Sequence, residues 1–98
     1  MGKGTKKMKK VLFLKNVMED EDIGIYSTLD KAKEKLINIL NKKIAFSHKY
    51  YKLYPNIEKD LINEIKEDID RIESSHTIED FNDEMIDNYE ITEWIIDE

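Results

Sequence analysis

Apolar residues recur at every third or fourth position through the middle of this chain, and this spacing restricts the fold more than any other sequence feature. The first series consists of Leu29, Ala32, Leu36, Leu40 and Ile44. The second consists of Ile57, Leu61, Ile65, Ile69 and Ile72. Such spacing places each series on one face of an α-helix. The sequence therefore predicts amphipathic helices at residues 28–44 and 56–73, capped by a hydroxyl of Ser27 or Thr28 and by Asn56.

Two shorter segments continue the helical spacing. The segment 46–54 carries Phe46, Tyr50 and Tyr54 and ends at Pro55, the only proline. The segment 78–86 carries Ile78, Phe81 and Met85. Aromatic residues among lysines can stack on bases while the lysines hold phosphates. At helical spacing, however, we interpret the set as core residues, namely Phe46, Tyr50, Leu53 and Tyr54.

Strand-like segments lie at both ends of the helical region. Val11–Leu14 is apolar on both faces, which predicts a central strand at residues 10–18. An acidic turn, Glu19–Asp22, separates it from an antiparallel strand at 22–27; the turn lacks the alternation and glycine of an EF-hand loop, so we expect no metal there. The β-branched and aromatic end predicts a third strand at 88–96, with a bulge or a helical continuation left open near Ile91. The expected fold class is α+β, with a small antiparallel sheet packed with helices.

The chain has 98 residues and no cysteine, which allows one domain and excludes disulfides and thiolate metal sites. Residues 1–10 hold five lysines and are expected to form a flexible basic arm before a single domain at 11–98. No apolar run reaches the roughly 18–20 residues that span a bilayer, and no signal peptide is evident. We expect a cytoplasmic protein of a bacterial host cell. A homodimer is compatible with a small domain whose sheet has a free edge.

The net charge of −6 hides two halves of opposite sign. Residues 1–57 hold 13 lysines and 6 acidic residues, whereas residues 58–98 hold 16 acidic residues and only three basic ones. Carboxylates spaced by three or four residues on a helix lie about 5–6 Å apart. Duplex DNA presents a comparably dense row of negative phosphates. The predicted partner-binding residues are Asp60, Glu64, Glu67, Asp68, Glu79, Asp80, Asp83, Glu84 and Asp87.

Our first hypothesis is that these residues serve a non-enzymatic binding function. The acidic surface imitates DNA and occupies the basic site of a nucleic-acid-binding host protein, with no direct contact to nucleic acid. The alternative is a small regulatory or adaptor domain that binds a protein through its sheet edge or its aromatic segment. Glycine-rich phosphate loops, nucleophile elbows and zinc motifs are absent from the sequence, so we expect no enzyme activity, cofactor or metal.

Two stretches resemble small bacterial and phage domains built as strand, acidic turn, strand and helix. The stretches are Ile23-Gly-Ile-Tyr-Ser-Thr28 with Asp30-Lys31-Ala32, and Ile86-Asp-Asn-Tyr-Glu-Ile-Thr-Glu-Trp94. The resemblance covers about half of the chain and implies a fold but no site; residues 45–80 depart from it, being longer, helical and more acidic. In character, the second half resembles the small acidic proteins with which phages block nucleic-acid-binding proteins. The composition is typical of an AT-rich Gram-positive bacterium or its phage.

Overall fold

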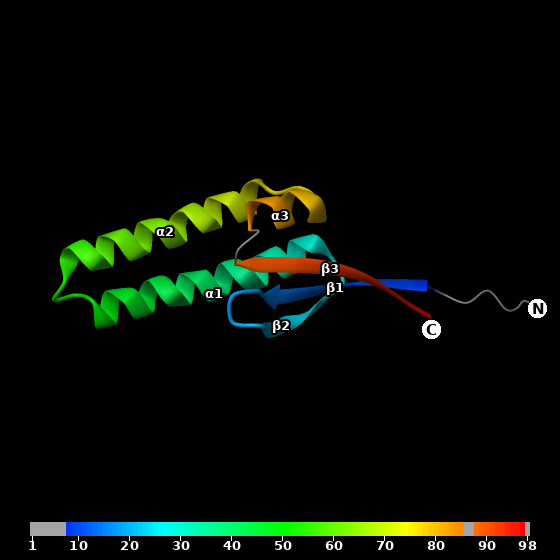
Figure 1. The fold of residues 1–98 in the computed structure, drawn as a ribbon, viewed down its shortest axis with the longest axis horizontal. Helices are drawn as coiled ribbons and strands as arrows, with labels where there is room; N and C mark the ends of the chain where they lie inside the picture. The colour runs from blue at the N-terminus through cyan, green and yellow to red at the C-terminus, as the bar shows by residue number, and fades with distance from the viewer. Residues whose placement is uncertain (1–7, 86–87, 98) are drawn as a thin grey trace, which may run out of the picture.

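Residues 8–85 and 88–97 fold into an α+β unit, which is the predicted fold class, with a three-stranded antiparallel sheet and three helices (Figure 1). The computed structural model describes residues 8–85 and 88–97. The elements in chain order are β1 (Met8–Asn16), β2 (Glu21–Tyr26), α1 (Leu29–Tyr50), α2 (Pro55–Ser74), α3 (Ile78–Glu84) and β3 (Tyr89–Asp97). The strands start and end within two residues of their predicted bounds.

The sheet has the order β2-β1-β3, so the predicted central strand is confirmed. Leu12 and Leu14 of β1 face the core, while Phe13 between them faces the opposite side, where it meets Trp94 of β3. The pairing of β1 with β3 runs without a shift from Met8–Asp97 to Asn16–Tyr89. The bulge and the helical continuation considered near Ile91 are therefore both absent from this pairing.

A bulge does occur, but between β1 and β2. The register shifts between Leu14 and Lys15, so Leu14 lies opposite Gly24 and Lys15 lies opposite Asp22. Without the extra residue, positions 23 and 26 would face opposite sides of the sheet. With it, both Ile23 and Tyr26 pack against the core.

The segments predicted as helices 28–44 and 46–54 are one helix, α1, which ends at Tyr50. No glycine or proline interrupts the sequence at residue 45, and the Ala45 backbone continues the helix. Thr28 caps it, because its hydroxyl accepts a hydrogen bond from the Lys31 amide at 3.2 Å. The segment 51–54 forms the turn into α2.

The predicted cap of α2 is wrong. Tyr54, not Asn56, is the N-cap residue, and no side chain caps this end. Pro55 occupies the first helical turn, where a backbone N–H has no intrahelical acceptor, so its missing donor carries no penalty. The same proline that ends one predicted segment therefore begins the next helix. The fourth predicted helix, 78–86, is α3 and ends at Glu84.

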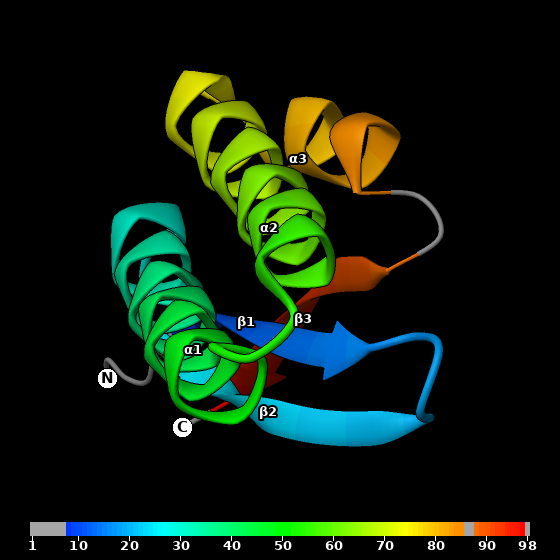
Figure 2. The same cartoon turned by 90° about the vertical axis from the view of Figure 1, so that its left-hand side faces the viewer.

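All three helices lie on one side of the sheet, as the view along the helices shows (Figure 2). The core between the layers contains Leu12, Leu14, Ala32, Leu36, Leu40, Ile72, Phe81, Met85, Tyr89 and Ile91. These residues come from the first half of α1, the second half of α2, α3 and the adjoining sheet. Nothing within residues 8–85 and 88–97 forms a second layer on the other side of the sheet.

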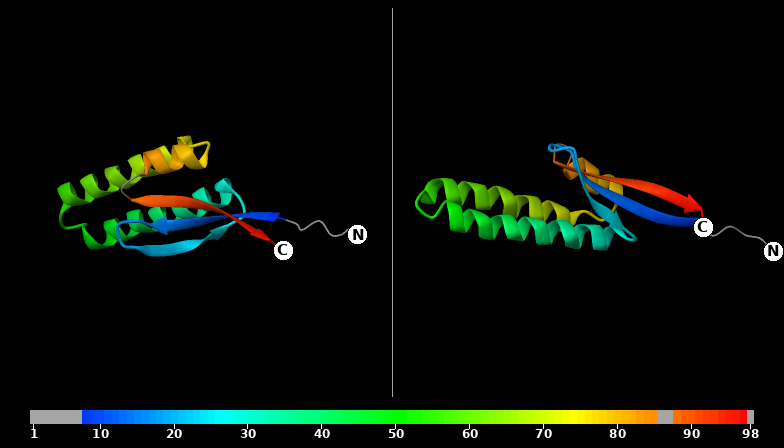
Figure 3. Two further views of the ribbon diagram at one scale, coloured as in Figure 1. Left: turned by 45° about the vertical axis from the view of Figure 1, so that its right-hand side comes forward. Right: turned by 90° about the horizontal axis from the view of Figure 1, so that it is seen from below.

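The antiparallel pair of α1 and α2 extends well past the end of the sheet (Figures 1 and 3). The molecule measures 68 × 22 × 20 Å and has a radius of gyration of 17.1 Å. A compact chain of this length has a radius of gyration of about 13 Å. We call the part of the helix pair beyond the sheet, residues 43–65, the overhang.

Candidate protein-binding surfaces

The carboxylates predicted on α2 gather along one flank of that helix. Asp60, Glu64 and Glu67 are exposed and lie four and three residues apart, which places them on one side over about 10 Å of helix. The two lysines of α2, Lys59 and Lys66, lie instead on the side that faces α1 and line a hollow there. The outer flank of α2 is thus acidic along the overhang.

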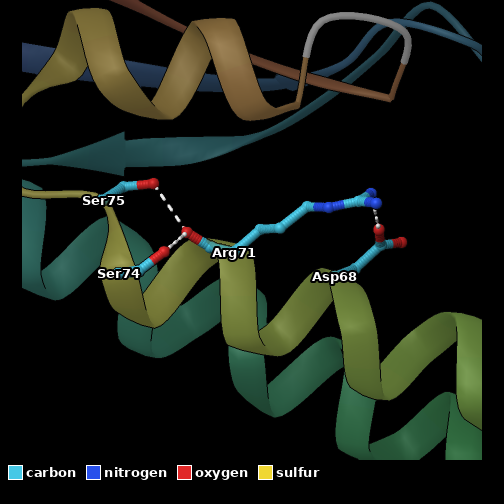
Figure 4. Close-up of polar contacts among 4 residues, drawn as sticks. All are labelled: Asp68, Arg71, Ser74 and Ser75. Atoms are coloured by element: carbon cyan, nitrogen blue, oxygen red, sulfur yellow. Dashed lines mark hydrogen bonds and ion pairs between the residues drawn. The ribbon is translucent and has the colours of Figure 1, made fainter.

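Asp68 belongs to the same flank but is less accessible. Its side chain is 22% exposed and pairs with Arg71 one turn later, at 3.3 Å between Oδ1 and the guanidinium (Figure 4). The Arg71 carbonyl accepts hydrogen bonds from the hydroxyls of Ser74 and Ser75. Burial raises the pKa of the Asp68 carboxyl, a shift that Arg71 opposes. Asp68 therefore forms the inner border of the acidic flank.

The second predicted group lies on α3. Glu79, Asp80, Asp83 and Glu84 are all exposed, while Phe81 beneath them is buried. Thr77 caps this short helix, because its hydroxyl oxygen accepts a hydrogen bond from the Asp80 backbone amide at 3.0 Å. The α3 helix packs beside the end of α2, so the two acidic groups sit on neighbouring helices (Figure 2). The ninth predicted residue, Asp87, lies outside the described residues.

Among the described residues the lysines of α1 form no ion pair with these carboxylates, although Lys43 lies near enough to Asp68 to oppose the rise in the pKa of that carboxyl. Two residues mark the side of α1 that contacts α2. Lys33 donates a hydrogen bond to the Ser75 carbonyl, and the ring of His48 contacts the carboxylate of Glu58. A row of exposed lysines lies on the opposite side of the helix, at Lys31, Lys35, Lys42 and Lys49. Among the described residues, Asp68 is the one predicted surface carboxylate that forms an ion pair. The helix pair therefore carries a basic outer flank on α1 and an acidic one on α2.

The aromatic segment is exposed, so our interpretation of it as core was wrong. The exposed fractions are 55% for Phe46, 59% for Tyr50, 81% for Leu53 and 59% for Tyr54. Phe46 and Tyr50 stack on each other, with 4.1 Å between ring centroids. The physical reason is the overhang: the helical spacing is correct, but the sheet that would cover this stretch ends before it. The helix is uncovered here because it is offset along the sheet and not because it is longer, since a 22-residue helix spans about 33 Å and a nine-residue strand about 30 Å.

The uncovered side of the sheet is a second apolar surface, which the sequence reasoning did not identify. Phe13 and Trp94 form an edge-to-face pair at 5.6 Å, and Val11 lies beside them. Ile25 and Ile96 are exposed by 59% and 46% on the neighbouring strands. The sequence did contain a signal for this surface. The strands carry apolar residues on both faces, but the predicted helices are too few to cover both.

One sheet edge is partly covered. The Asn82 side chain of α3 donates to the Ile91 carbonyl at 2.9 Å and accepts from the Ile91 amide at 2.8 Å. It thereby takes the place of a neighbouring strand at this point of β3. Partner binding through the β3 edge would have to displace this contact or use another stretch of the strand.

Within residues 8–85 and 88–97, no three His, Asp or Glu side chains lie close enough to hold a metal ion. No helix in these ranges combines the length and apolar content that crossing a membrane requires. Comparison with known proteins found no matching family, no matching curated protein and no matching solved structure.

Proposed function

We propose that this protein is a non-enzymatic inhibitor of the phage type, which uses its acidic surface to occupy the basic site of a nucleic-acid-binding protein. The observation that carries the proposal is the outer flank of α2. There Asp60, Glu64 and Glu67 are exposed on one side, while the lysines of both helices point elsewhere. The α3 carboxylates extend the negative charge onto the neighbouring helix.

Such a flank meets the electrostatic requirements of a competitor for DNA. A DNA-binding site presents Lys and Arg side chains spaced for phosphates, and its long-range field attracts any dense row of negative charge. The α2 flank supplies carboxylates on a rigid helix, so little ordering is needed when a partner binds. DNA and this protein would then exclude each other from the same basic site.

The charge arrangement has a cost that a binding role explains. Like charges four residues apart, such as Asp60 and Glu64, destabilise a helix by about 0.2–0.5 kcal/mol per pair. Glu79 and Asp83 on α3 incur the same repulsion. In a domain of this size the total stability is only about 5–15 kcal/mol. A basic partner removes the repulsion upon binding, which favours a docking surface over a merely solvated one.

Capture from a Gram-positive bacterial lysate tests the proposal. The immobilised protein is compared with the D60N/E64Q/E67Q variant and with the control E19Q/E21Q/D22N, which removes the same charge from the β1–β2 turn region. We expect wild type and control to retain nucleic-acid-binding proteins that a salt gradient elutes, and the α2 variant to retain at least about tenfold less. Equal capture by all three proteins, or capture that persists at high salt, would contradict the proposal.

A second function is favoured by one observation, the exposure of the aromatic segment. Contiguous exposed apolar surface rimmed by charges marks protein interaction sites. Tyrosine and other aromatic residues also dominate the energetics of protein interfaces. We therefore propose an adaptor role through Phe46, Tyr50 and their neighbours as the alternative. It predicts that capture of a protein partner depends on these residues more than on any carboxylate.

A further inference from the structure

The sheet-facing side of the helix pair continues into the overhang without a sheet beneath it. On α1, Lys43 marks this side because its Nζ lies 3.4 Å from the Tyr89 hydroxyl at the start of β3. Phe46 and Tyr50 follow three and seven residues later, so they lie on the same side. Both are more than half exposed.

The same holds for α2. Ile65 and Asp68 face the end of the sheet, where they line a hollow with Asn16, Met18 and Tyr89. Leu61 lies one turn before Ile65, and Ile57 lies one turn before Leu61, so both continue this side of the helix. Ile57 is 49% exposed and Leu61 is partly exposed. We define the underside of the overhang as Phe46, Tyr50, Ile57 and Leu61.

The underside has charged borders of opposite sign. Lys42 and Lys49 run along its α1 border, and Asp60 and Glu64 run along its α2 border; all four are exposed. The end of the sheet closes its inner end as a step, where the β1–β2 turn presents Met18 with 75% of its surface exposed. The hollow in this corner has a volume of about 250 Å³. Together these features make a shelf with an apolar floor and one closed end, where Lys43, Asp68 and Glu19 line the hollow.

A second copy of the chain does not suit this shelf. A two-fold axis parallel to the helices would place each sheet in the space of the other copy's helices, because the sheet occupies the layer below α1 and α2 (Figures 1 and 3). A two-fold axis across the helices leaves room for both sheets, but it stacks α1 on α1 and α2 on α2. Lysine rows would then meet lysine rows, and like charges at an interface are unfavourable.

We propose that the underside binds an amphipathic helix of a partner protein, with acidic residues along one border of its apolar stripe and basic residues along the other. This proposal rests on the adaptor function above and specifies its partner class. The acidic border of the bound helix would lie beside Lys42 and Lys49, and its basic border beside Asp60 and Glu64. Its apolar stripe would cover Phe46, Tyr50, Ile57 and Leu61, completing the layer that the sheet leaves unfilled.

Helical peptides of designed sequence test the proposal with the full-length protein. Three stapled peptides of about four turns share one leucine stripe. Their borders carry glutamate on one side and lysine on the other, glutamate on both, or lysine on both. We expect the mixed peptide to bind at least about tenfold more tightly than either uniform peptide by fluorescence anisotropy, because only it pairs with both borders.

Protein variants show where the peptide binds. F46S/Y50S should weaken the mixed peptide at least about tenfold, whereas F13S/W94S, which alters the open side of the sheet, should leave binding unchanged. Circular dichroism checks that both variants remain folded. Equal affinity of the three peptides, or binding unaffected by F46S/Y50S, overturns the proposal. So does a wild-type dimer in light scattering that F46S/Y50S converts to a monomer, because the occupant is then a second copy.

Failure of this proposal and failure of the adaptor function give different results. If the adaptor function holds but the partner is not a helix of this kind, F46S/Y50S still abolishes capture of the native partner from lysate while the peptides do not discriminate. If the adaptor function itself fails, native capture is unaffected by F46S/Y50S.

Discussion

Asn82 shows how one side chain can complete the sheet. Its amide makes both the donor and the acceptor contact that a neighbouring strand would make to Ile91. The buried Phe81 beside it fixes the position of α3 over β3. This single residue therefore links the last helix to the edge strand.

Asn82→Ala should lower the free energy of unfolding by about 1–3 kcal/mol, because two backbone groups of Ile91 lose their partner. Asn82→Asp turns the donor into a charged acceptor that faces the Ile91 carbonyl oxygen, so it should also lower the free energy of unfolding. Asn63→Ala, on an exposed position of α2, should change stability by no more than about 0.5 kcal/mol. Chemical denaturation measures all three; an Asn82→Ala protein as stable as wild type would show that the contact contributes nothing.

Asp68 gives a prediction about pH. Its pKa is raised, mainly by burial, above the usual value of 3.8. When the pKa of a carboxyl is higher in the folded protein than in the unfolded chain, the group stabilises the fold at any pH below the unfolded-chain pKa. This contribution is lost as the pH rises through the folded-protein pKa. The free energy of unfolding of Asp68→Asn, relative to that of wild type, should therefore be highest at neutral pH. It should fall relative to wild type as the solution is acidified towards pH 3.8. A stability difference that is independent of pH, measured by urea denaturation, would contradict this.

Gly24, which lies opposite Leu14 next to the bulge, makes room for the side chain of Tyr26. The Tyr26 side chain folds back over it, and a Cβ atom at position 24 would lie 2.6 Å from the Tyr26 hydroxyl oxygen. Burial of Tyr26 also raises the pKa of its hydroxyl. The sequence predicts a strand here, but it does not reveal that the glycine makes room for a neighbouring ring.

At the level of elements, local spacing predicted most of the fold. The apolar stripe from Leu29 to Ile44 and the one from Ile57 to Ile72 both became helices, and Val11–Leu14 became the central strand. The predictions failed where a boundary depends on tertiary context. The spacing of Phe46 and Tyr50 indicates a helix, but whether that face is covered depends on where the sheet ends. The role of Pro55 was likewise ambiguous, since proline both ends and begins helices.

Lys33 connects the two long helices at the end where they meet the sheet. Its ammonium donates to the Ser75 carbonyl at 2.6 Å and lies 3.5 Å from the Glu73 carbonyl. These groups belong to the C-terminal end of α2, where unpaired carbonyls and the helix dipole favour a positive charge. A residue of α1 therefore caps α2.

Lys33→Met should lower the free energy of unfolding by about 1–2 kcal/mol, because a charged hydrogen bond to a partly buried carbonyl is lost. Lys35→Met, two residues away on the outer flank, removes the same charge and should change stability by no more than about 0.5 kcal/mol. Thermal unfolding followed by circular dichroism measures both. Equal losses in the two variants would assign the effect to net charge and not to the cap.

At the scale of the whole molecule, the overhang separates the surfaces of the protein. The end that contains the sheet holds the core, whereas the helix pair beyond it carries a basic flank, an acidic flank and an apolar underside. The sequence predicts the acidic residues individually and their helical spacing. It does not predict that the row of exposed lysines on α1, from Lys31 to Lys49, points away from them, because this depends on how the two helices are rotated against each other. That rotation leaves the α2 carboxylates free to meet a partner.

Displacement of DNA is the most direct test of the proposed function. A nucleic-acid-binding protein captured by the wild-type chain is first loaded with labelled DNA and then titrated with wild type, D60N/E64Q/E67Q or E19Q/E21Q/D22N in a gel-shift assay. Wild type and the turn-region control should release the DNA at similar concentrations, while the α2 variant should require at least about tenfold more. Release of DNA by the α2 variant as efficient as by wild type, or no release by any of the three, would contradict a DNA-like role for this flank.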